Sequence, residues 1–325
     1  MAVDPVPWFV GGGAEHSPEV ARLLAYAAFR GSEGVIGPEA LAVRPLAVPG
    51  AGVRVLAGAC AILNRAAGGS YQAYAGRLPS EETLPVAATG SGSGRSDLVV
   101  MRVEDPYMPG EPWSDPVDPT AGPYLFPRLI AGVPSTTRTV SQLGLGYSAI
   151  ALARIDLPLS TGTVTDAVIV DLRRVANPRR ERTVRTFNPG SSYQVTATAY
   201  GTGLWTNATF NLDIPVWATQ AIVRTSVGGV SITVGSAYGG IRTRIGDATM
   251  ITTQGTQYDE SVPSGAVQDR KFWQDNDTIS VPSALRGTVQ PVTLQAYRSS
   301  GSTATVTANT GTSIAFDIEL LESPV

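Results

Sequence analysis

The sequence contains very little of the three side chains on which most enzymes and metal sites depend. Its 325 residues include one cysteine (Cys60), one histidine (His16) and one lysine (Lys271). A single cysteine excludes an intrachain disulfide, and one cysteine with one histidine nearly excludes a zinc site. Cys60 lies in an apolar run, where a buried thiol is expected rather than a nucleophile. We therefore expect no bound metal and no cofactor.

The chain also lacks a net positive charge and a long apolar run. Its formal net charge is -3 and its pI is about 5.3, whereas a protein that wraps nucleic acid needs a basic face. No apolar run reaches the length of about 18 residues that spans a membrane. The first residues, Met1 to Pro5, have neither the basic nor the apolar region of a secretory signal. We expect synthesis in a cytoplasm, no binding to nucleic acid and no membrane insertion.

The groups that a hydrolase needs are scarce as well. His16 lies just before a predicted helix, where capping suits it better than catalysis. The stretch from Gly90 to Gly94 lacks the strand-to-helix context that makes the serine of a Gly-x-Ser-x-Gly turn reactive. Glycosidases use two carboxylates, so a glycan hydrolase stays open as an alternative. The neighbouring carboxylates in question are Asp259 with Glu260 and Asp275 with Asp277. We expect that the chain is not an enzyme.

The composition that is present indicates a mainly β protein. Hydrophobic residues make up 43% and charged residues 16%, as in globular proteins, and the chain is long enough for two domains. Its 35 glycines and 24 prolines indicate many turns and few long helices. We predict an N-terminal mixed β module with one helix, followed by an antiparallel β-sandwich.

The one helix is predicted from Ser17 to Phe29. Ser17 is placed to cap it, and Pro18 takes its first position. Apolar residues at helical spacing should line one face. These are Val20, Leu23, Leu24 and Ala27 or Ala28. A single amphipathic helix among strands needs a partner, which is either the sheet of its own domain or a neighbouring subunit.

The stretch from Arg95 to Pro106 is a short apolar run closed by Asp-Pro, which predicts a strand. Arg95 and Asp97 lie two residues apart, so they share one face of it. If that face is buried, the two charges must form a structural ion pair, because an uncompensated buried charge is strongly unfavourable. The alternative is a solvated strand edge. A second run, Val164 to Arg173, should form a hairpin with Leu145 to Pro158.

These stretches carry a resemblance to a known family. The sequences RSDLVVMRVEDP (residues 95–106) and IALARIDLPLSTGTVTDAVIVDLR (residues 150–173) resemble the N-terminal module of minor tail or baseplate proteins of long-tailed, siphovirus-like bacteriophages, particularly those of actinobacterial hosts. The resemblance covers about residues 1–182. It implies a virion protein of the tail tip or baseplate that forms a homo-oligomer, usually a trimer, and contacts other tail-tip proteins. The chain departs from the family in an acidic insertion, Glu111 to Asp118.

Two segments are candidates for contacts between subunits. The start of the chain carries Trp8 and Phe9 in a bulky apolar cluster. The stretch from Tyr107 to Thr139 is rich in proline, which should exclude regular structure there. We interpret this stretch as an arm that packs on a neighbouring subunit, and a covering Ω-loop is the alternative.

The charged junction from Asn177 to Arg182 predicts a boundary between domains at residues 1–182 and 183–325. Its arginines either contact an acidic partner or are solvated. Beyond it, short alternating segments at regular intervals predict a β-sandwich of the jelly-roll type. Gly228-Gly229, between two such segments, is a hairpin signature. The segment from Val281 to Ala308 resembles the C-terminal sandwich of phage tail proteins, whose general shape carbohydrate-binding modules share.

Aromatic and carboxylate side chains gather in predicted loops of this second domain. Sugars stack their C–H faces on rings while carboxylates accept their hydroxyl groups. We predict Tyr258, Asp259, Trp273 and Asp275 as a site for host cell-wall carbohydrate. The alternative is that the tryptophans close the ends of the sandwich. The expected function is a structural tail-tip protein that presents a sandwich to host glycans. The alternatives are a capsid decoration or fibre protein and a glycan hydrolase of the tail.

Overall fold

The structure is a computed structural model that describes residues 17–110, 122, 124–200, 208–246, 250–253 and 255–325. Strands make up 50% of the chain and helices 7%, which confirms the prediction of a mainly β protein. The chain divides into two compact units, residues 1–177 with Pro324–Val325 and residues 178–323. The division lies at the start of the predicted junction, because strand β11 (Arg180–Phe187) pairs within the second unit.

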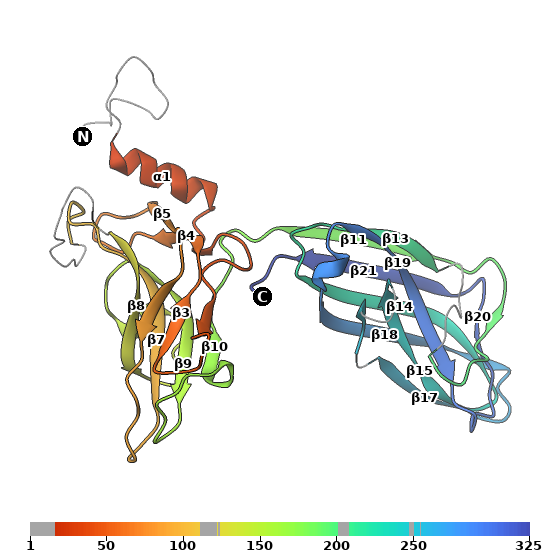
Figure 1. Cartoon of the computed structure of the whole chain (residues 1–325). Coiled ribbons are helices and arrows are strands. Elements are labelled where there is room, and N and C mark those ends of the chain that lie inside the picture. The colour runs from red at the N-terminus through yellow and green to blue at the C-terminus, as the bar shows by residue number, and fades with distance from the viewer. Residues whose placement is uncertain (1–16, 111–121, 123, 201–207, 247–249, 254) are drawn as a thin grey trace. The chain divides into compact units, whose positions relative to one another are not determined.

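The first unit contains three antiparallel sheets in its described residues, and Figure 1 labels several of their strands. Their spatial orders are β1-β4-β5, β2-β3-β6 and β10-β9-β7-β8. The strands are β1 (Gly34–Val35), β2 (Val43–Pro45), β3 (Gly52–Val55), β4 (Gly58–Leu63), β5 (Ala73–Leu78), β6 (Glu82–Pro85), β7 (Arg95–Val103), β8 (Leu125–Val133), β9 (Ala149–Leu157) and β10 (Ile169–Asp171). The helical segments are α1 (Pro18–Ala28) and two 3-10 helices, η1 (Val140–Leu143) and η2 (Asp166–Val168). Apolar residues of all three sheets share one core cluster.

Strand β7 is buried on both faces because its apolar run is continuous rather than alternating. Leu98 and Val100 belong to one hydrophobic cluster, and Val99 and Met101 belong to another. β7 pairs with β8 and with β9, and β9 also pairs with β10. The predicted hairpin between residues 145–158 and 164–173 is therefore confirmed.

The proline-rich stretch contains regular structure, so the prediction that prolines exclude it was wrong. Strand β8 includes Pro127, which lies opposite Met101 of β7. β8 is the edge strand of its sheet, and an edge position tolerates a residue without an amide donor because one side of the strand has no ladder partner. Residues 111–121 lie outside the described residues, and the proposed arm stays a prediction.

Helix α1 forms where the capping pattern predicts it. The Ser17 side chain accepts a hydrogen bond of 3.2 Å from the Val20 amide, Pro18 takes the first position and Glu19 lies in the first turn. Arg30 and Gly31 then adopt left-handed conformations, which end the helix. α1 packs against β5 (Figure 1).

The second unit is a sandwich of two antiparallel sheets. One has the spatial order β11-β21-β14-β18 and the other β13-β19-β15-β17. If these eight main strands are numbered along the chain, one sheet contains the first, eighth, third and sixth strands. The other sheet contains the second, seventh, fourth and fifth. This is the strand order of a jelly roll, as the sequence predicts.

The strands of this unit after β11 have the following bounds. They are β12 (Tyr193–Gln194), β13 (Thr209–Ile214), β14 (Gln220–Thr233), β15 (Gly235–Ile245), β16 (Met250–Ile251), β17 (Thr256–Val262), β18 (Gln268–Ser280), β19 (Thr288–Arg298), β20 (Val306–Ala308) and β21 (Ser313–Leu321). A 3-10 helix, η3 (Ser283–Leu285), precedes β19. One core cluster fills the space between the sheets, with Ile241, Ile314 and Phe316 fully buried.

The predicted hairpin turn at Gly228-Gly229 is wrong, because β14 runs straight through both glycines. The pairing of β14 with β18 shifts register between Gly228 and Val230, so the glycines form a β-bulge. Gly229 has a φ of 75°, and a Cβ there would overlap the carbonyl oxygen of Gly311. The glycine pair thus serves a close backbone approach rather than a reversal of the chain.

Cys60 lies in β4, inside the core of the first unit. Burial raises the pKa of its thiol to about 12, as expected for a structural rather than a nucleophilic cysteine. None of the helices in the described ranges is long and apolar enough to cross a membrane.

Candidate functional site

The two rings predicted to hold a sugar lie inside the sandwich. Tyr258 of β17 and Trp273 of β18 are each 5% exposed, and their rings stack on one another with centroids 4.2 Å apart and planes 6° apart. Trp273 donates from Nε1 to Glu260 at 3.2 Å, and the Tyr258 hydroxyl donates to the Tyr297 carbonyl at 2.7 Å. Each ring covers one face of the other, and the burial of both side chains closes the remaining faces to a ligand. The outcome is closer to the alternative, in which the tryptophan packs the sandwich.

Asp275 is also an interior residue, and β18 is a strand where a loop was expected. One oxygen, Oδ2, accepts hydrogen bonds from the Thr243 amide (2.8 Å), the Thr243 hydroxyl (2.9 Å) and the Thr252 hydroxyl (2.7 Å). Burial raises the pKa of this carboxyl above its ordinary value, while the hydrogen bonds oppose the rise. Asp275 therefore anchors β18 to the opposite sheet and is closed to a sugar.

Asp259 alone of the predicted four lies on the surface. It is the register partner of Tyr238 across β15 and β17, so the two side chains share the outer face of that sheet. Tyr238 is 40% exposed. The sequence analysis did not single out Tyr238, although its alternation with buried Ala237 and Gly239 was a usable signal.

Arg95 and Asp97 form an ion pair with two contacts, Nε to Oδ1 at 2.7 Å and Nη2 to Oδ2 at 2.8 Å. Asp97 is fully buried and also accepts a hydrogen bond of 2.9 Å from the Gly132 amide of β8. The pair holds β7 to its neighbour, which is a structural role. Trp8 and Phe9, predicted as contacts between subunits, lie outside the described residues.

The arginines of the junction are mostly engaged within the chain. Arg182 forms two contacts with Asp317 of β21, at 2.7 and 2.8 Å, and Arg179 lies 2.7 Å from Glu322. These guanidinium groups hold the pKa of both carboxyls below their usual values. They are thus taken up by the second unit rather than left for an acidic partner. Arg174, which precedes the junction, has no side-chain partner among the described residues.

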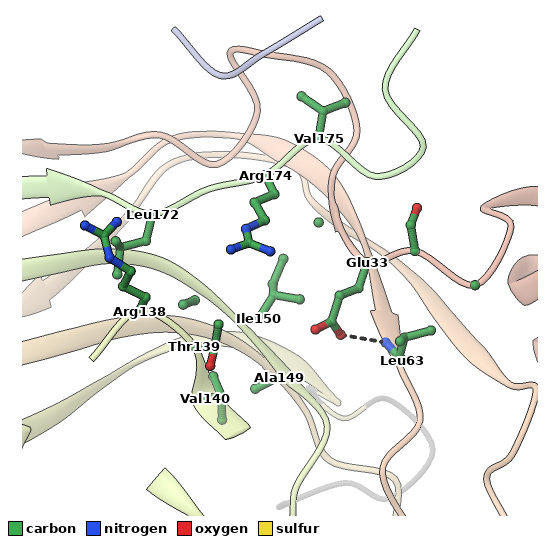
Figure 2. A pocket seen from close by; sticks show the side chains of 14 residues that line it. Glu33, Leu63, Arg138, Thr139, Val140, Ala149, Ile150, Leu172, Arg174 and Val175 are labelled. Carbon is green, nitrogen blue, oxygen red and sulfur yellow. Dashed lines mark hydrogen bonds between the residues drawn. The ribbon is translucent and has the colours of Figure 1, made fainter. Parts of the chain in front are cut away.

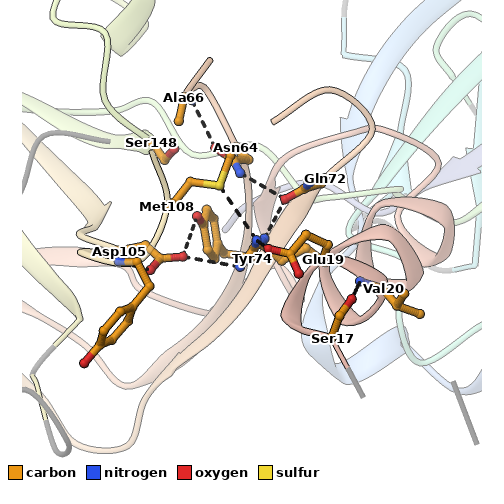
Figure 3. A network of polar contacts seen from close by, with 12 residues as sticks. Ser17, Glu19, Val20, Asn64, Ala66, Gln72, Tyr74, Asp105, Met108 and Ser148 are labelled. Carbon is orange, nitrogen blue, oxygen red and sulfur yellow. Dashed lines mark hydrogen bonds and ion pairs between the residues drawn. The ribbon is translucent and has the colours of Figure 1, made fainter. Parts of the chain in front are cut away.

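A polar network fixes which side of helix α1 turns inward. The Arg22 guanidinium donates to Gln72 Oε1 at 2.5 Å and to Asp105 Oδ2 at 3.3 Å, and it lies over the ring of Tyr74. The Tyr74 hydroxyl donates to the same Asp105 oxygen at 3.0 Å (Figure 3). These partners lie next to β5 and just after β7. The Arg22 side of the helix therefore faces its own unit.

The apolar face predicted for α1 is consequently turned outward. Leu23 is 49% exposed and Leu24 is 43% exposed, and none of the residues of α1 is buried. Ala27 is exposed one turn further on. Two partners were considered for this face, the sheet of its own unit and a neighbouring subunit. In the described part of the chain, the sheet of its own unit does not cover the face. We call Val20, Leu23, Leu24 and Ala27 the outer face of α1.

The first unit also has a cavity of about 340 Å³, shown in Figure 2. Its apolar lining includes Leu63, Ala149, Ile150 and Leu172. Three charged side chains border it as well, and these are Glu33, Arg138 and Arg174. Glu33 is compensated, because Arg65 lies 2.5 Å from its carboxylate and the Leu63 amide donates to it at 3.2 Å. Neither arginine that borders the cavity has a side-chain partner in the described ranges.

The backbone holds both arginines in place. The Arg174 carbonyl accepts from the Val35 amide at 2.8 Å, and Gly34 allows this approach because a Cβ there would overlap that carbonyl oxygen. The Arg138 amide donates to Gln142 Oε1 at 2.7 Å, at the start of η1. The cavity is thus bordered by two arginines whose backbone is anchored. Sequence reasoning missed it because its lining comes from segments far apart in the chain.

A metal site would need several coordinating side chains close together. No group of three or more histidine, cysteine, aspartate or glutamate side chains that could hold a metal ion occurs among the residues that the structure describes.

The sequence matches no protein-family model, and it matches no curated protein. Among solved structures, it aligns over 90% of its length with 70% of a chain in the structure of infectious bursal disease virus, Gx strain, at 12% identity and a TM-score of 0.28. It also aligns over 90% of its length with 72% of a chain in the VP2 subviral particle of that virus, at 13% identity and a TM-score of 0.26. At such TM-scores these likenesses carry no argument about fold or function.

Proposed function

We propose that the chain is a non-enzymatic structural protein of a virus particle that associates with copies of itself through its first unit. The observation that carries the proposal is the outer face of α1, which the described residues of its own unit leave uncovered. The resemblance of residues 95–106 and 150–173 to minor tail proteins supports the finer proposal of a homotrimer in the tail tip or baseplate of a long-tailed bacteriophage.

A second copy is the partner that this face fits best. Val20, Leu23, Leu24 and Ala27 recur at the spacing of a helix-helix seam and include no charge. A symmetric contact places the same patch against itself, so an uncharged stripe is complementary to its own copy.

The test is the oligomeric state of the full chain by size-exclusion chromatography with light scattering. We expect an oligomer for the wild type and a monomer for the double variant Leu23→Glu/Leu24→Glu. The matched control is Val48→Glu, which changes an 82% exposed apolar residue elsewhere in the first unit and should leave the oligomer intact. A monomeric wild type, or a double variant that still associates, contradicts the proposal.

The position in the particle needs a separate measurement. Mass spectrometry of purified virions should detect the chain, and antibody labelling in electron micrographs should place it on the tail. Labelling of the head would favour the capsid decoration alternative instead.

Glycan binding is a second candidate function for the jelly roll. The observation that favours it is the exposed pair of Tyr238 and Asp259, which sets a ring beside a carboxylate on one outer face. On a glycan array the full chain should bind a host cell-wall sugar, and Tyr238→Ala should abolish the signal. Phe272→Ala, which removes a 64% exposed ring from β18, is the control. Equal binding by Tyr238→Ala and wild type would exclude this face.

A further inference from the structure

We propose that the cavity bordered by Arg138 and Arg174 is a binding site for an acidic peptide segment. A carboxylate of the segment would lie at the two guanidinium groups, and an adjoining apolar side chain would rest on the lining. The site belongs to the first unit and does not involve the outer face of α1, so it can exist whether or not that face mediates self-association.

The charge balance of the cavity favours an anion. Glu33 is the acidic group in its lining, and its charge is met by Arg65 at 2.5 Å. That pairing leaves Arg138 and Arg174 as two positive charges without a counter-charge in the described chain. Many other arginines of the first unit are paired, as Arg95 with Asp97 and Arg154 with Asp156 illustrate. Arg138 and Arg174 differ from these pairs, and also from the exposed Arg44, because both of these exposed guanidinium groups border one cavity.

The remaining lining selects a peptide over a bare inorganic ion. Leu63, Ile150, Leu172 and Val175 give the cavity an apolar wall that a small hydrated ion cannot use. A volume of about 340 Å³ accommodates one or two side chains and lies at the lower end of the range for ligand pockets. A carboxylate forms two parallel hydrogen bonds with a guanidinium group, which gives the contact direction as well as charge.

The site is also prepared in advance of binding. Arg174 lies on backbone that pairs with Val35, and the Ala176 amide donates to the Val35 carbonyl at 2.9 Å. The turn that carries Arg138 is closed by Gln142, which accepts from the Arg138 and Thr139 amides. Anchored backbone reduces the entropy lost on binding, which raises affinity without additional contacts.

The chain itself supplies a suitable probe. The sequence Glu111-Pro-Trp-Ser-Asp-Pro-Val-Asp118 combines three carboxylates with Trp113 and Val117. As a synthetic peptide with blocked ends and a fluorescent label, it can be offered in trans to the full-length protein. A second peptide with its acidic residues changed to Gln and Asn keeps the shape and removes the charge.

Fluorescence anisotropy should detect binding of the acidic peptide and not of the neutral peptide, and added salt should weaken it. Arg174→Ala and Arg138→Ala should each weaken binding about tenfold or more, because a charged hydrogen bond within the site is lost. Arg44→Ala is the matched control, since Arg44 is an exposed arginine of the same unit that lies outside the cavity and has no side-chain partner in the described part of the chain. Arg44→Ala should bind the acidic peptide as the wild type does.

Three results would overturn the proposal. These are equal binding of the acidic and neutral peptides, equal loss in Arg44→Ala and Arg174→Ala, and no binding of the acidic peptide at any concentration tested. Arg174→Lys provides a check on folding, because it keeps the charge without the planar fork and should bind with intermediate affinity. Peptide binding by the monomeric Leu23→Glu/Leu24→Glu variant separates this site from self-association.

Discussion

The two units differ in how far each completes its own interior. The second unit closes one core between two sheets, and even a buried carboxylate, Asp275, finds three donors inside it. The first unit leaves an apolar helix face uncovered and two arginines of one cavity without partners in the described residues. The contacts that we propose with partners therefore lie on the first unit, at groups that its described residues leave uncovered or unpaired.

The largest expected effect is in the core of the second unit. Trp273→Ala should lower the free energy of unfolding by about 3–5 kcal/mol, because it removes a buried ring that stacks on Tyr258. Phe272→Ala, one residue away but 64% exposed, should change it by no more than about 0.5 kcal/mol. Urea unfolding followed by circular dichroism measures both. Similar values for the two variants would mean that Trp273 is not a core residue.

The bulge of β14 should be nearly as sensitive. Gly229→Ala should destabilise the second unit by about 2 kcal/mol or more, because it combines a left-handed backbone with a Cβ overlapping the Gly311 carbonyl. Gly228→Ala is the control, since the nearest atom to its Cβ would lie 3.6 Å away. If both substitutions cost the same in thermal unfolding, the bulge is not where the structure places it.

Asp275 gives the second unit a stability that depends on pH. Because its pKa is raised in the folded state, the carboxyl holds its proton more tightly when folded than when unfolded. As pH rises from the ordinary value of 3.8 toward the raised pKa, this residue therefore contributes a loss of stability. In urea unfolding across this range, Asp275→Asn should gain stability relative to wild type as pH rises. A difference independent of pH would show that Asp275 does not titrate this way.

The smallest effect on stability is expected on the helix of the first unit. Leu23→Ser should change the free energy of unfolding by no more than about 0.5 kcal/mol at dilute concentrations, because the side chain is half exposed. At higher concentrations the wild type should become the more stable of the two, since association stabilises the folded state. Unfolding at several protein concentrations measures this gap. A large loss under dilute conditions would place Leu23 in the core.

Local sequence signals predicted most of the elements. The Ser-Pro cap located α1, and alternation predicted that the second unit consists of short strands, because these signals depend on neighbours in the chain. The polar sequence of β18 hid a strand whose inner face carries Trp273, Asp275 and Ile279. Asp275 can lie there only because Thr243 and Thr252 donate hydrogen bonds to it from elsewhere in the fold. No local sequence pattern predicts such partners.

The orientation of elements was harder to predict than their existence. The helical pattern correctly grouped Leu23 and Leu24 on one face, yet it could not say which way that face points. The answer depends on Gln72 and Asp105, which draw Arg22 inward from distant positions. The arginine cavity could not be predicted for the same reason, since Arg138 and Arg174 border one cavity only in the folded chain.

The buried thiol of Cys60 can be used to measure how often the first unit opens. Shielded in β4 with its pKa raised to about 12, it should resist a thiol reagent until the surrounding strands separate. The rate at which the reagent labels Cys60 would then measure the frequency of this local opening, and it would show whether assembly with other copies makes the opening less frequent.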